Sequence, residues 1–233
     1  MTVTSSLERD VQQVCDLVSQ SKRDIGRTII GIAGPPASGK STLAEAVVDA
    51  LNKAGDSDVP QATLLPMDGY HLDNRILESR GLLPRKGAPD TFDALGFCDA
   101  VRALTDITRE AFFSRFDRQL DLAIANAIVV CPGTPVVVVE GNYLFLASDP
   151  WASLQDVFAA TVFVSPTLDQ LRARLIQRWL DHGLDHAASI DRAEKNDLPN
   201  AELVLAQSTE ADLSLTQNHS EFGTDTFDKA TCL

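Results

Sequence analysis

The residues from Gly34 to Ser41 are the part of the sequence whose types and spacing most clearly predict chemistry. They match the pattern Gly-x-x-x-x-Gly-Lys-Ser/Thr, with Lys40 and Ser41 at its end. Glycines at such positions let successive backbone N–H groups converge on phosphate oxygens. Lys40 would reach the β- and γ-phosphates of a nucleotide, most simply ATP, and the Ser41 hydroxyl would bind Mg²⁺. The expected contacts to the nucleotide are Gly34, Pro35, Pro36, Ala37, Ser38, Gly39, Lys40, Ser41 and Thr42.

The flanking residues favour this interpretation over a Gly/Pro turn that carries a surface lysine. Residues 28–33 are rich in β-branched side chains and predict a strand that leads into the glycines. Residues 41–53 have a helical pattern that Gly55 ends. The positive end of such a helix would add to the attraction for phosphate.

Two carboxylates follow predicted strands and could complete a phosphoryl-transfer site. Asp68 follows the predicted strand 62–67, in which Pro66 suits only a position near an end. It could accept the proton of an acceptor hydroxyl, or it could simply cap a turn before Gly69. Glu140 follows four valines, and because a buried carboxylate needs a partner, we expect it to bind Mg²⁺ or pair with an arginine.

Cationic side chains between residues 168 and 180 could neutralise the transferred phosphoryl group. Arg174 and Arg178 are four residues apart and share a helix face, and Arg172 lies nearby. They could close over the phosphates from a lid or lie on a solvated face with local Asp partners. His182 and His186 have a spacing that can bind zinc, but no third ligand is evident, so a surface turn is the simpler interpretation.

The order of predicted elements indicates an α/β fold of the P-loop NTPase type. Strands expected at 28–33, 62–67, 136–139, 161–164 and 211–215 alternate with helices expected at 5–20, 41–53, 74–80, 96–108, 167–180 and 184–195. Such alternation predicts a doubly wound, mainly parallel sheet flanked by helices, with ligands beyond the carboxyl ends of the strands. We expect one domain over residues 1–233, with a helical lid at about 170–196, a functional loop at 68–95 and a polar tail at about 216–233.

Composition limits the partners and the location of the protein. The 233 residues carry a net charge of −13, which argues against binding to nucleic acid or to anionic membranes. The cysteines, at 15, 98, 131 and 232, have no CxxC spacing and indicate incidental thiols in a reducing compartment. The polar N-terminus is unlike a signal peptide, and no apolar run has the length of a membrane span, so we expect a cytoplasmic protein.

Seven segments in order resemble the phosphoribulokinase/uridine kinase/pantothenate kinase group of P-loop small-molecule kinases. The resemblance covers most of residues 26–215 and is closest to a bacterial branch described as sugar kinases associated with fructose transport. The segments are GIAGPPASGKST (31–42), MDGYHLDN (67–74), RKGAPDTFD (85–93), FDR (116–118), EGNYL (140–144), RLIQRW (174–179) and NDLPNAELV (196–204).

The resemblance implies a role for each matched residue. Asp68 corresponds to the catalytic base, Glu140 to the acidic residue near magnesium, and Arg174 and Arg178 to lid arginines. The implied acceptor-pocket residues are Tyr70, His71, Lys86, Arg118 and Tyr143, and those on the adenine side are Asn196, Pro199 and Asn200. Two departures weaken a pantothenate assignment: the segment before Phe116 lacks an expected proline, and Arg118 replaces a different polar residue.

The leading hypothesis is an ATP- and Mg²⁺-dependent kinase that phosphorylates a hydroxyl group of a small metabolite, with a sugar such as fructose as the first candidate. A nucleoside such as uridine, or pantothenate, is the next. An ATP-binding regulator without phosphotransfer is the alternative of another class. A GTPase is disfavoured because Asn52-Lys53-Ala54-Gly55 does not form the Asn-Lys-x-Asp signature of guanine binding. Relatives make a homodimer plausible.

Overall fold

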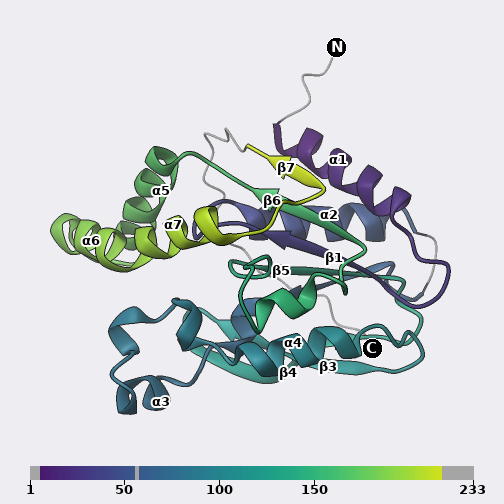
Figure 1. The fold of residues 1–233 in the computed structure, drawn as a ribbon, viewed down its shortest axis with the longest axis horizontal. Helices are drawn as coiled ribbons and strands as arrows, with labels where there is room; N and C mark the ends of the chain where they lie inside the picture. The colour runs from purple at the N-terminus through teal and green to yellow at the C-terminus, as the bar shows by residue number, and fades with distance from the viewer. Residues whose placement is uncertain (1–5, 56–57, 217–233) are drawn as a thin grey trace.

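Five parallel strands form the central sheet of the computed structural model, which describes residues 6–55 and 58–216 (Figure 1). The strand order is β2-β5-β1-β6-β7. The strands are β1 (Thr28–Ala33), β2 (Ala62–Pro66), β5 (Val136–Gly141), β6 (Ala160–Val164) and β7 (Leu213–Leu215). The expected α/β fold with a mainly parallel sheet is therefore confirmed, and Pro66 lies at the end of an edge strand, where its missing N–H is tolerated.

The register of the strands brings their carboxyl ends to one edge. Glu140 on β5 lies opposite Ile32 on β1 and opposite Pro66 on β2. The residues that follow β1 and β2 therefore emerge beside Glu140. This places the glycine loop, the Asp68 turn and Glu140 at one site, as the sequence predicted.

Helices cover both faces of the sheet. Alternate side chains of a strand point to opposite faces, so Ile30 and Ile32 pack with α1 (Ser6–Gln20) and α2 (Lys40–Lys53) on one face. On the other face, Ile29 belongs to a second cluster with residues of α4 (Ala94–Ala103) and α7 (Leu198–Gln207). Each strand of the middle of the sheet is thus buried on both sides, which explains the uninterrupted apolar runs of β1 and β5.

An antiparallel hairpin, β3 (Ala111–Asp117) and β4 (Leu122–Val130), forms a separate two-stranded sheet that the sequence analysis did not predict. Much of β4 is exposed, so it lacks the apolar run that identified the central strands. The hairpin packs against the 3₁₀ turn Met67–Tyr70. Gly69 permits this contact, because a Cβ atom there would lie 2.0 Å from the Ser114 carbonyl oxygen.

The remaining helices largely follow the predicted ranges. α3 (Asn74–Ser79) lies within the loop 68–95. α4 begins before the expected residue 96, because Asp93 caps it by accepting from the Gly96 N–H, and it ends at Ala103, before the expected residue 108. α5 (Leu168–Asp181) and α6 (His186–Arg192) lead through a π-helical turn, Ala193–Asp197, into α7, a helix that the sequence analysis missed. We call residues 168–197 the lid. The predicted tail lies almost wholly outside the described residues.

Two further expectations can be compared with the described part of the chain. Cys15, Cys98 and Cys131 form no disulfide, as expected, and Cys232 lies outside the described residues. Among the helices of residues 6–55 and 58–216, none combines the length and the apolar character that crossing a membrane requires.

The Arg27 guanidinium, at the start of β1, is 1% exposed and is bound entirely by backbone carbonyl groups. It donates hydrogen bonds to the carbonyl oxygens of Leu104, Asp106, Arg109, Cys131 and Thr134. These carbonyls belong to the segments on either side of the β3–β4 hairpin. Arg27 therefore ties the hairpin's base to the central sheet, and its burial lowers its pKa.

Replacing Arg27 by Met is expected to lower the free energy of unfolding by about 3 kcal/mol, because several buried carbonyls lose a charged donor. Urea denaturation measures the loss. Arg102→Met is the matched control, since the Arg102 side chain is 44% exposed and pairs with Asp99 on the surface. It should change the unfolding free energy by no more than about 0.5 kcal/mol. Equal effects of the two substitutions would contradict the role of Arg27.

Candidate active site

The glycine loop lies between β1 and α2 and has the curled backbone that phosphate binding requires. Ala37 and Gly39 adopt φ angles of 61° and 92°. Gly34 must lack a side chain, because a Cβ atom there would lie 2.5 Å from the Val164 carbonyl oxygen. Within the described residues, the buried Ser38 hydroxyl has no hydrogen-bond partner. A cradle of N–H groups with an unpaired hydroxyl fits the oxygen atoms of a phosphate group.

Lys40, Ser41 and Glu140 meet beneath this loop. The Ser41 hydroxyl donates to a Glu140 carboxylate oxygen at 3.3 Å, and the Lys40 ammonium lies 4.0 Å from the same oxygen. The side chains of Lys40 and Glu140 are only 13% and 6% exposed. Burial lowers the pKa of Lys40 and raises the pKa of Glu140, because each charge is desolvated. A bound phosphate would stabilise the charged form of Lys40, and a bound cation would stabilise the charged form of Glu140.

This arrangement fits Mg²⁺. Ser41 and Glu140 supply the hard oxygen ligands that the ion prefers, and phosphate oxygens and water would supply the rest. No group of three or more His, Cys, Asp or Glu side chains in the described ranges could hold a metal ion by itself. The His182 and His186 pair accordingly lacks a third ligand there.

Asp68 lies on the turn after β2 with about a third of its side chain exposed. Its carboxylate is 3.8 Å from the Arg118 guanidinium. Burial alone would raise the pKa of Asp68, but the charges of His71 and Lys40, with those of Arg118 and Arg178, outweigh burial and lower it. Asp68 is therefore ionised at neutral pH and able to accept a proton.

The lid brings cations to the same place. Arg174 donates to the carbonyl oxygen of Ser38 at 3.2 Å, so it reaches the glycine loop from α5. The charge of Arg178 lowers the pKa values of both Lys40 and Asp68, which places it within electrostatic reach of the two. Arg172 instead pairs with Glu194 at 2.5 Å within the lid. The structure thus brings Arg174 to the loop, leaves Arg178 within electrostatic reach of Lys40 and Asp68, and keeps Arg172 on a solvated face.

His71 stands beside Asp68 in the predicted acceptor pocket, and Lys86 reaches Phe116, which packs on His71. The His71 Nδ1 atom is 2.8 Å from the Asp68 carbonyl oxygen. The ring of His71 lies between Phe92 and Phe116, with centroid distances of 4.0 Å and 4.6 Å. Burial lowers the pKa of His71, so it is mainly neutral at pH 7. Phe92 and Phe116 were not identified from sequence, although both lie in segments that carried the family resemblance.

The two tyrosines predicted for this pocket contact the hydrophobic core. Tyr143 is fully buried, and its hydroxyl donates to the Gly87 carbonyl oxygen at 2.5 Å. Tyr70 packs against Phe97 with the ring centroids 5.1 Å apart. Tyr143 thus lies within the core, whereas Tyr70 is only partly buried against it, and the acceptor role of both stays a prediction.

The residues predicted for the adenine side lie where the lid meets α7. Asn196 and Asn200 are buried, and Pro199 is exposed. The Asn196 amide donates to the Lys86 carbonyl oxygen at 3.1 Å, so it faces the acceptor pocket segment. The adenine role of these residues stays a prediction.

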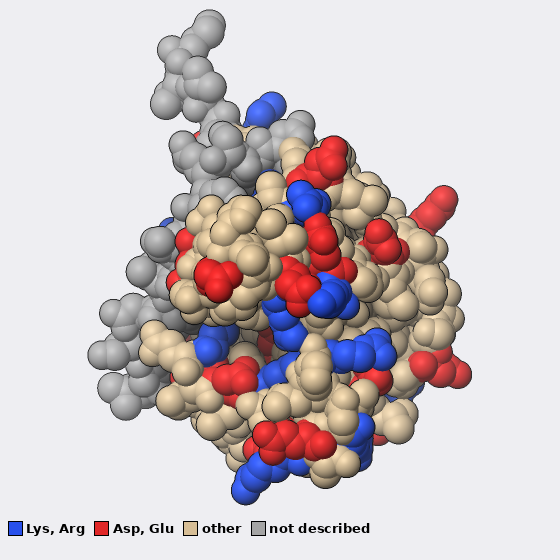
Figure 2. Space-filling model, turned by 90° about the vertical axis from the view of Figure 1, so that its left-hand side faces the viewer, with Lys and Arg blue, Asp and Glu red and all other residues tan. Residues whose placement is uncertain are grey.

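The charge of the site contrasts with the acidic surface around it. Figure 2 views the left-hand side of Figure 1, where the lid lies above the segment that carries α3, and Lys and Arg side chains gather in a hollow between them. On the rest of this face, acidic side chains are scattered among uncharged surface and further Lys and Arg groups. A protein with a net charge of −13 thus keeps a local cationic site for an anionic ligand.

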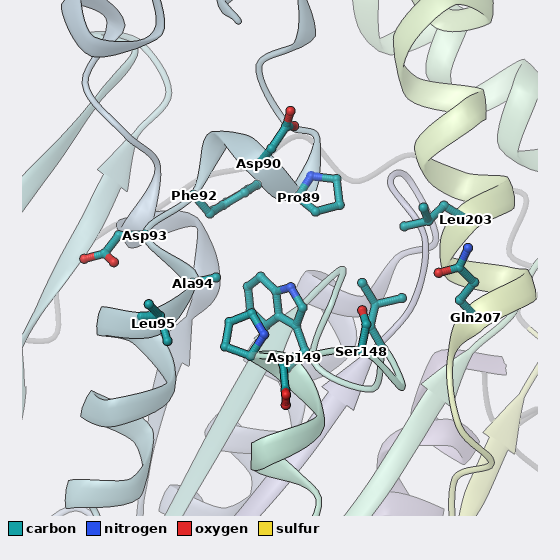
Figure 3. Close-up of a pocket in the computed structure, with 13 residues that line it drawn as sticks. Pro89, Asp90, Phe92, Asp93, Ala94, Leu95, Ser148, Asp149, Leu203 and Gln207 are labelled. Carbon is teal, nitrogen blue, oxygen red and sulfur yellow. The ribbon is translucent and has the colours of Figure 1, made fainter. Parts of the chain in front are cut away.

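A cavity of about 500 Å³ lies next to this site, and Phe92, which packs on His71, lines it (Figure 3). It opens between the 89–95 segment, the 146–151 loop and α7. Its polar rim includes Asp90, Asp93 and Asp149, and none of the residues predicted for nucleotide or metal binding lines it. The candidate active site is therefore the cationic hollow.

Comparisons with known proteins identify the family, although no family model matches the chain. The crystal structure of a "putative fructose transport system kinase" from Silicibacter sp. TM1040 is 43% identical, with a TM-score of 0.82, over 88% of this chain and 98% of that one. "Putative uridine kinase C227.14" of Schizosaccharomyces pombe is 32% identical over 201 residues, which cover 82% of this chain and 83% of the relative. The pantothenate kinase of Leifsonia xyli is 32% identical over 156 residues, 65% of this chain and 45% of that enzyme.

The chain belongs to the uridine kinase and pantothenate kinase group of P-loop kinases. The resemblance inferred from seven short segments is confirmed. The protein is a nucleotide-binding phosphotransferase, and the glycine loop stays the predicted nucleotide site of this kinase.

Replacing Lys40 by Met is expected to weaken ATP binding at least about tenfold, because the kinase loses the cation that faces the phosphates. Isothermal titration calorimetry with Mg-ATP measures the affinity. Lys53→Met is the control, since Lys53 is exposed in the last turn of the same helix. An unchanged ATP affinity in Lys40→Met would contradict the assignment of the loop.

Proposed function

We propose that this kinase transfers the γ-phosphoryl group of ATP to a hydroxyl group of a small metabolite, with Asp68 as the catalytic base. The observation that carries the proposal is the position of Asp68. Its carboxylate is ionised and partly exposed, and it shares one sheet edge with Lys40 and Glu140. A base beside the phosphate loop can serve an acceptor alcohol that lies in line with the γ-phosphate.

The residues divide the reaction between them. The loop from Gly34 to Thr42 would hold the phosphates, and Ser41 and Glu140 would hold Mg²⁺, which supplies positive charge to the β- and γ-phosphate oxygens. Lys40, Arg174 and Arg178 would neutralise the charge of the transferred group. Asp68 would take the proton of the acceptor hydroxyl. The acceptor oxygen would bond to the γ-phosphorus as the bond between that phosphorus and the bridging oxygen of the β-phosphate breaks, which releases ADP. Pro199 and Asn200 are proposed for the adenine side, to which the resemblance also assigned Asn196.

For the acceptor we propose a sugar such as fructose, and hence a role in carbohydrate metabolism. Support comes from the name of the relative that is 43% identical over nearly its whole length. His71 and Arg118 offer polar groups that suit several hydroxyls, while the Lys86 ammonium, also predicted for this pocket, donates to Asn74 and Asp121. Uridine or another nucleoside, and pantothenate, follow as alternatives from the names of other relatives. We place the reaction in the cytoplasm, where ATP is supplied, and a homodimer stays a prediction.

A coupled ADP-release assay with Mg-ATP tests the proposal over fructose, other sugars, uridine, other nucleosides and pantothenate. We expect one acceptor class to raise ADP release at least about tenfold above the rate without acceptor. Tight ATP binding with no acceptor-dependent ADP release would instead favour an ATP-binding regulator.

Asp68→Asn should leave ATP affinity nearly unchanged and lower turnover with the true acceptor at least about a hundredfold, because the amide cannot take the proton. Steady-state kinetics and calorimetry together measure both effects. Asp99→Asn is a matched control, since Asp99 is exposed on α4 and pairs with Arg102. Full turnover in Asp68→Asn would rule out Asp68 as the base.

A further inference from the structure

The backbone of residues 84–87, which we call the acceptor loop, is held from the lid by two side chains. Arg192, at the end of α6, donates to the carbonyl oxygens of Pro84 at 2.5 Å and of Lys86 at 3.4 Å. Asn196, in the π-helical turn, donates to the same Lys86 carbonyl oxygen at 3.1 Å. A segment about 110 positions earlier in the chain is thus fixed by the lid.

The side chain of Lys86 holds the β3–β4 hairpin on the opposite side. Its ammonium donates to Asn74 Oδ1 and to Asp121 Oδ1, both at 2.7 Å, and to the Asp121 carbonyl oxygen at 3.0 Å. Asp121 lies in the turn of the hairpin. The ammonium is also 5.0 Å from the centroid of Phe116, which packs on His71 beside Asp68. Lys86 therefore links two parts of the protein. Its carbonyl oxygen binds the lid, and its ammonium group binds the hairpin beside the acceptor pocket.

The two lid residues are themselves fixed by the helix that carries the lid arginines. The Arg192 guanidinium lies over Trp179, with its carbon 5.2 Å from the ring centroid. The Trp179 N–H donates to Asp197 Oδ2 at 2.5 Å, and Asn196 donates to Asp197 Oδ1 at 3.3 Å. Trp179 directly follows Arg178 on α5. The arginines proposed to face the phosphates and the donors that bind the acceptor loop are therefore connected through Trp179 and Asp197.

We propose that Arg192 and Asn196 are positioning residues that set the acceptor loop for phosphoryl transfer, with Lys86 as the joint between the lid and the hairpin. The inference rests on the proposed function, because it gives the loop the task of placing the acceptor. It reassigns Asn196: its amide is used by the Lys86 carbonyl and by Asp197, so loss of this side chain should affect the acceptor and not the adenine. Movement of the lid by one ligand would then move the binding groups of the other.

Hydrogen exchange measured by mass spectrometry tests the joint directly. The N–H groups of Arg85, Lys86 and Ala88 make turn hydrogen bonds, to Leu82, Leu83 and Arg85 in that order, that should open more often when the loop is released. In Asn196→Ala and in Arg192→Ala we expect these amides, and those of the hairpin turn 117–122, to exchange at least about fivefold faster with Mg²⁺ and a non-hydrolysable ATP analogue bound. Protection of the glycine loop by the analogue should persist.

Arg172→Ala is the matched control, since it removes a lid arginine whose partner, Glu194, is exposed and within the lid. Its acceptor-loop exchange should equal that of the parent protein. Unchanged exchange in both Asn196→Ala and Arg192→Ala would overturn the proposal, as would equal acceleration in Arg172→Ala. Arg192 is only partly buried, so it provides a test even where a change at the buried Asn196 prevents folding.

Kinetics separate positioning from a structural or adenine role. With the acceptor identified by the ADP-release assay, fructose being tested first, both variants should raise the acceptor KM about tenfold and leave the ATP KM and kcat within about threefold. Arg192→Lys, which keeps one donor, should restore part of the loss. A raised ATP KM with an unchanged acceptor KM would overturn the proposal. Failure of every acceptor would count against the proposed function, while the exchange experiment would still decide whether the joint exists.

Discussion

The contact between Lys40 and Glu140 is the interaction on which the site depends. A buried cation and a buried carboxylate 4.0 Å apart are each costly to desolvate, so the fold must hold them together. The register that sets Ile32 against Glu140 does this, because it makes β1 and β5 end at the same level. Once this edge exists, the turn after β2 can deliver Asp68 beside it. The proposed triphosphate site and the proposed base therefore both depend on one strand alignment.

The lid and the hairpin complete the site from outside the sheet. Arg174 crosses to the glycine loop, and the Arg192 and Asn196 side chains cross to the acceptor loop. Lys86 carries the connection on to Asp121 in the hairpin. A kinase must exclude water while it holds two substrates in line. A single network that spans lid, acceptor loop and hairpin is suited to close around both substrates together.

The sequence predicted those parts of the site that short local patterns encode. The glycine loop has fixed spacing, the central strands are buried on both faces and the lid helices have regular periodicity, so each could be located along the chain. The hairpin could not be located in this way, because β4 is largely exposed and its position depends on contacts with the Asp68 turn. The burial of Tyr143 and the five carbonyl partners of Arg27 also depend on segments far apart in sequence. Such long-range pairing leaves no periodic signal.

The destination of the γ-phosphate tests the central claim most directly. The kinase, incubated with γ-labelled ATP, Mg²⁺ and a mixture of small metabolites, can be followed by separating labelled ATP, inorganic phosphate and organic phosphates. Our account predicts that the label moves into one phosphorylated alcohol and that Asp68→Asn abolishes this transfer. Label that appears only as inorganic phosphate, or remains in ATP with every metabolite, would contradict it.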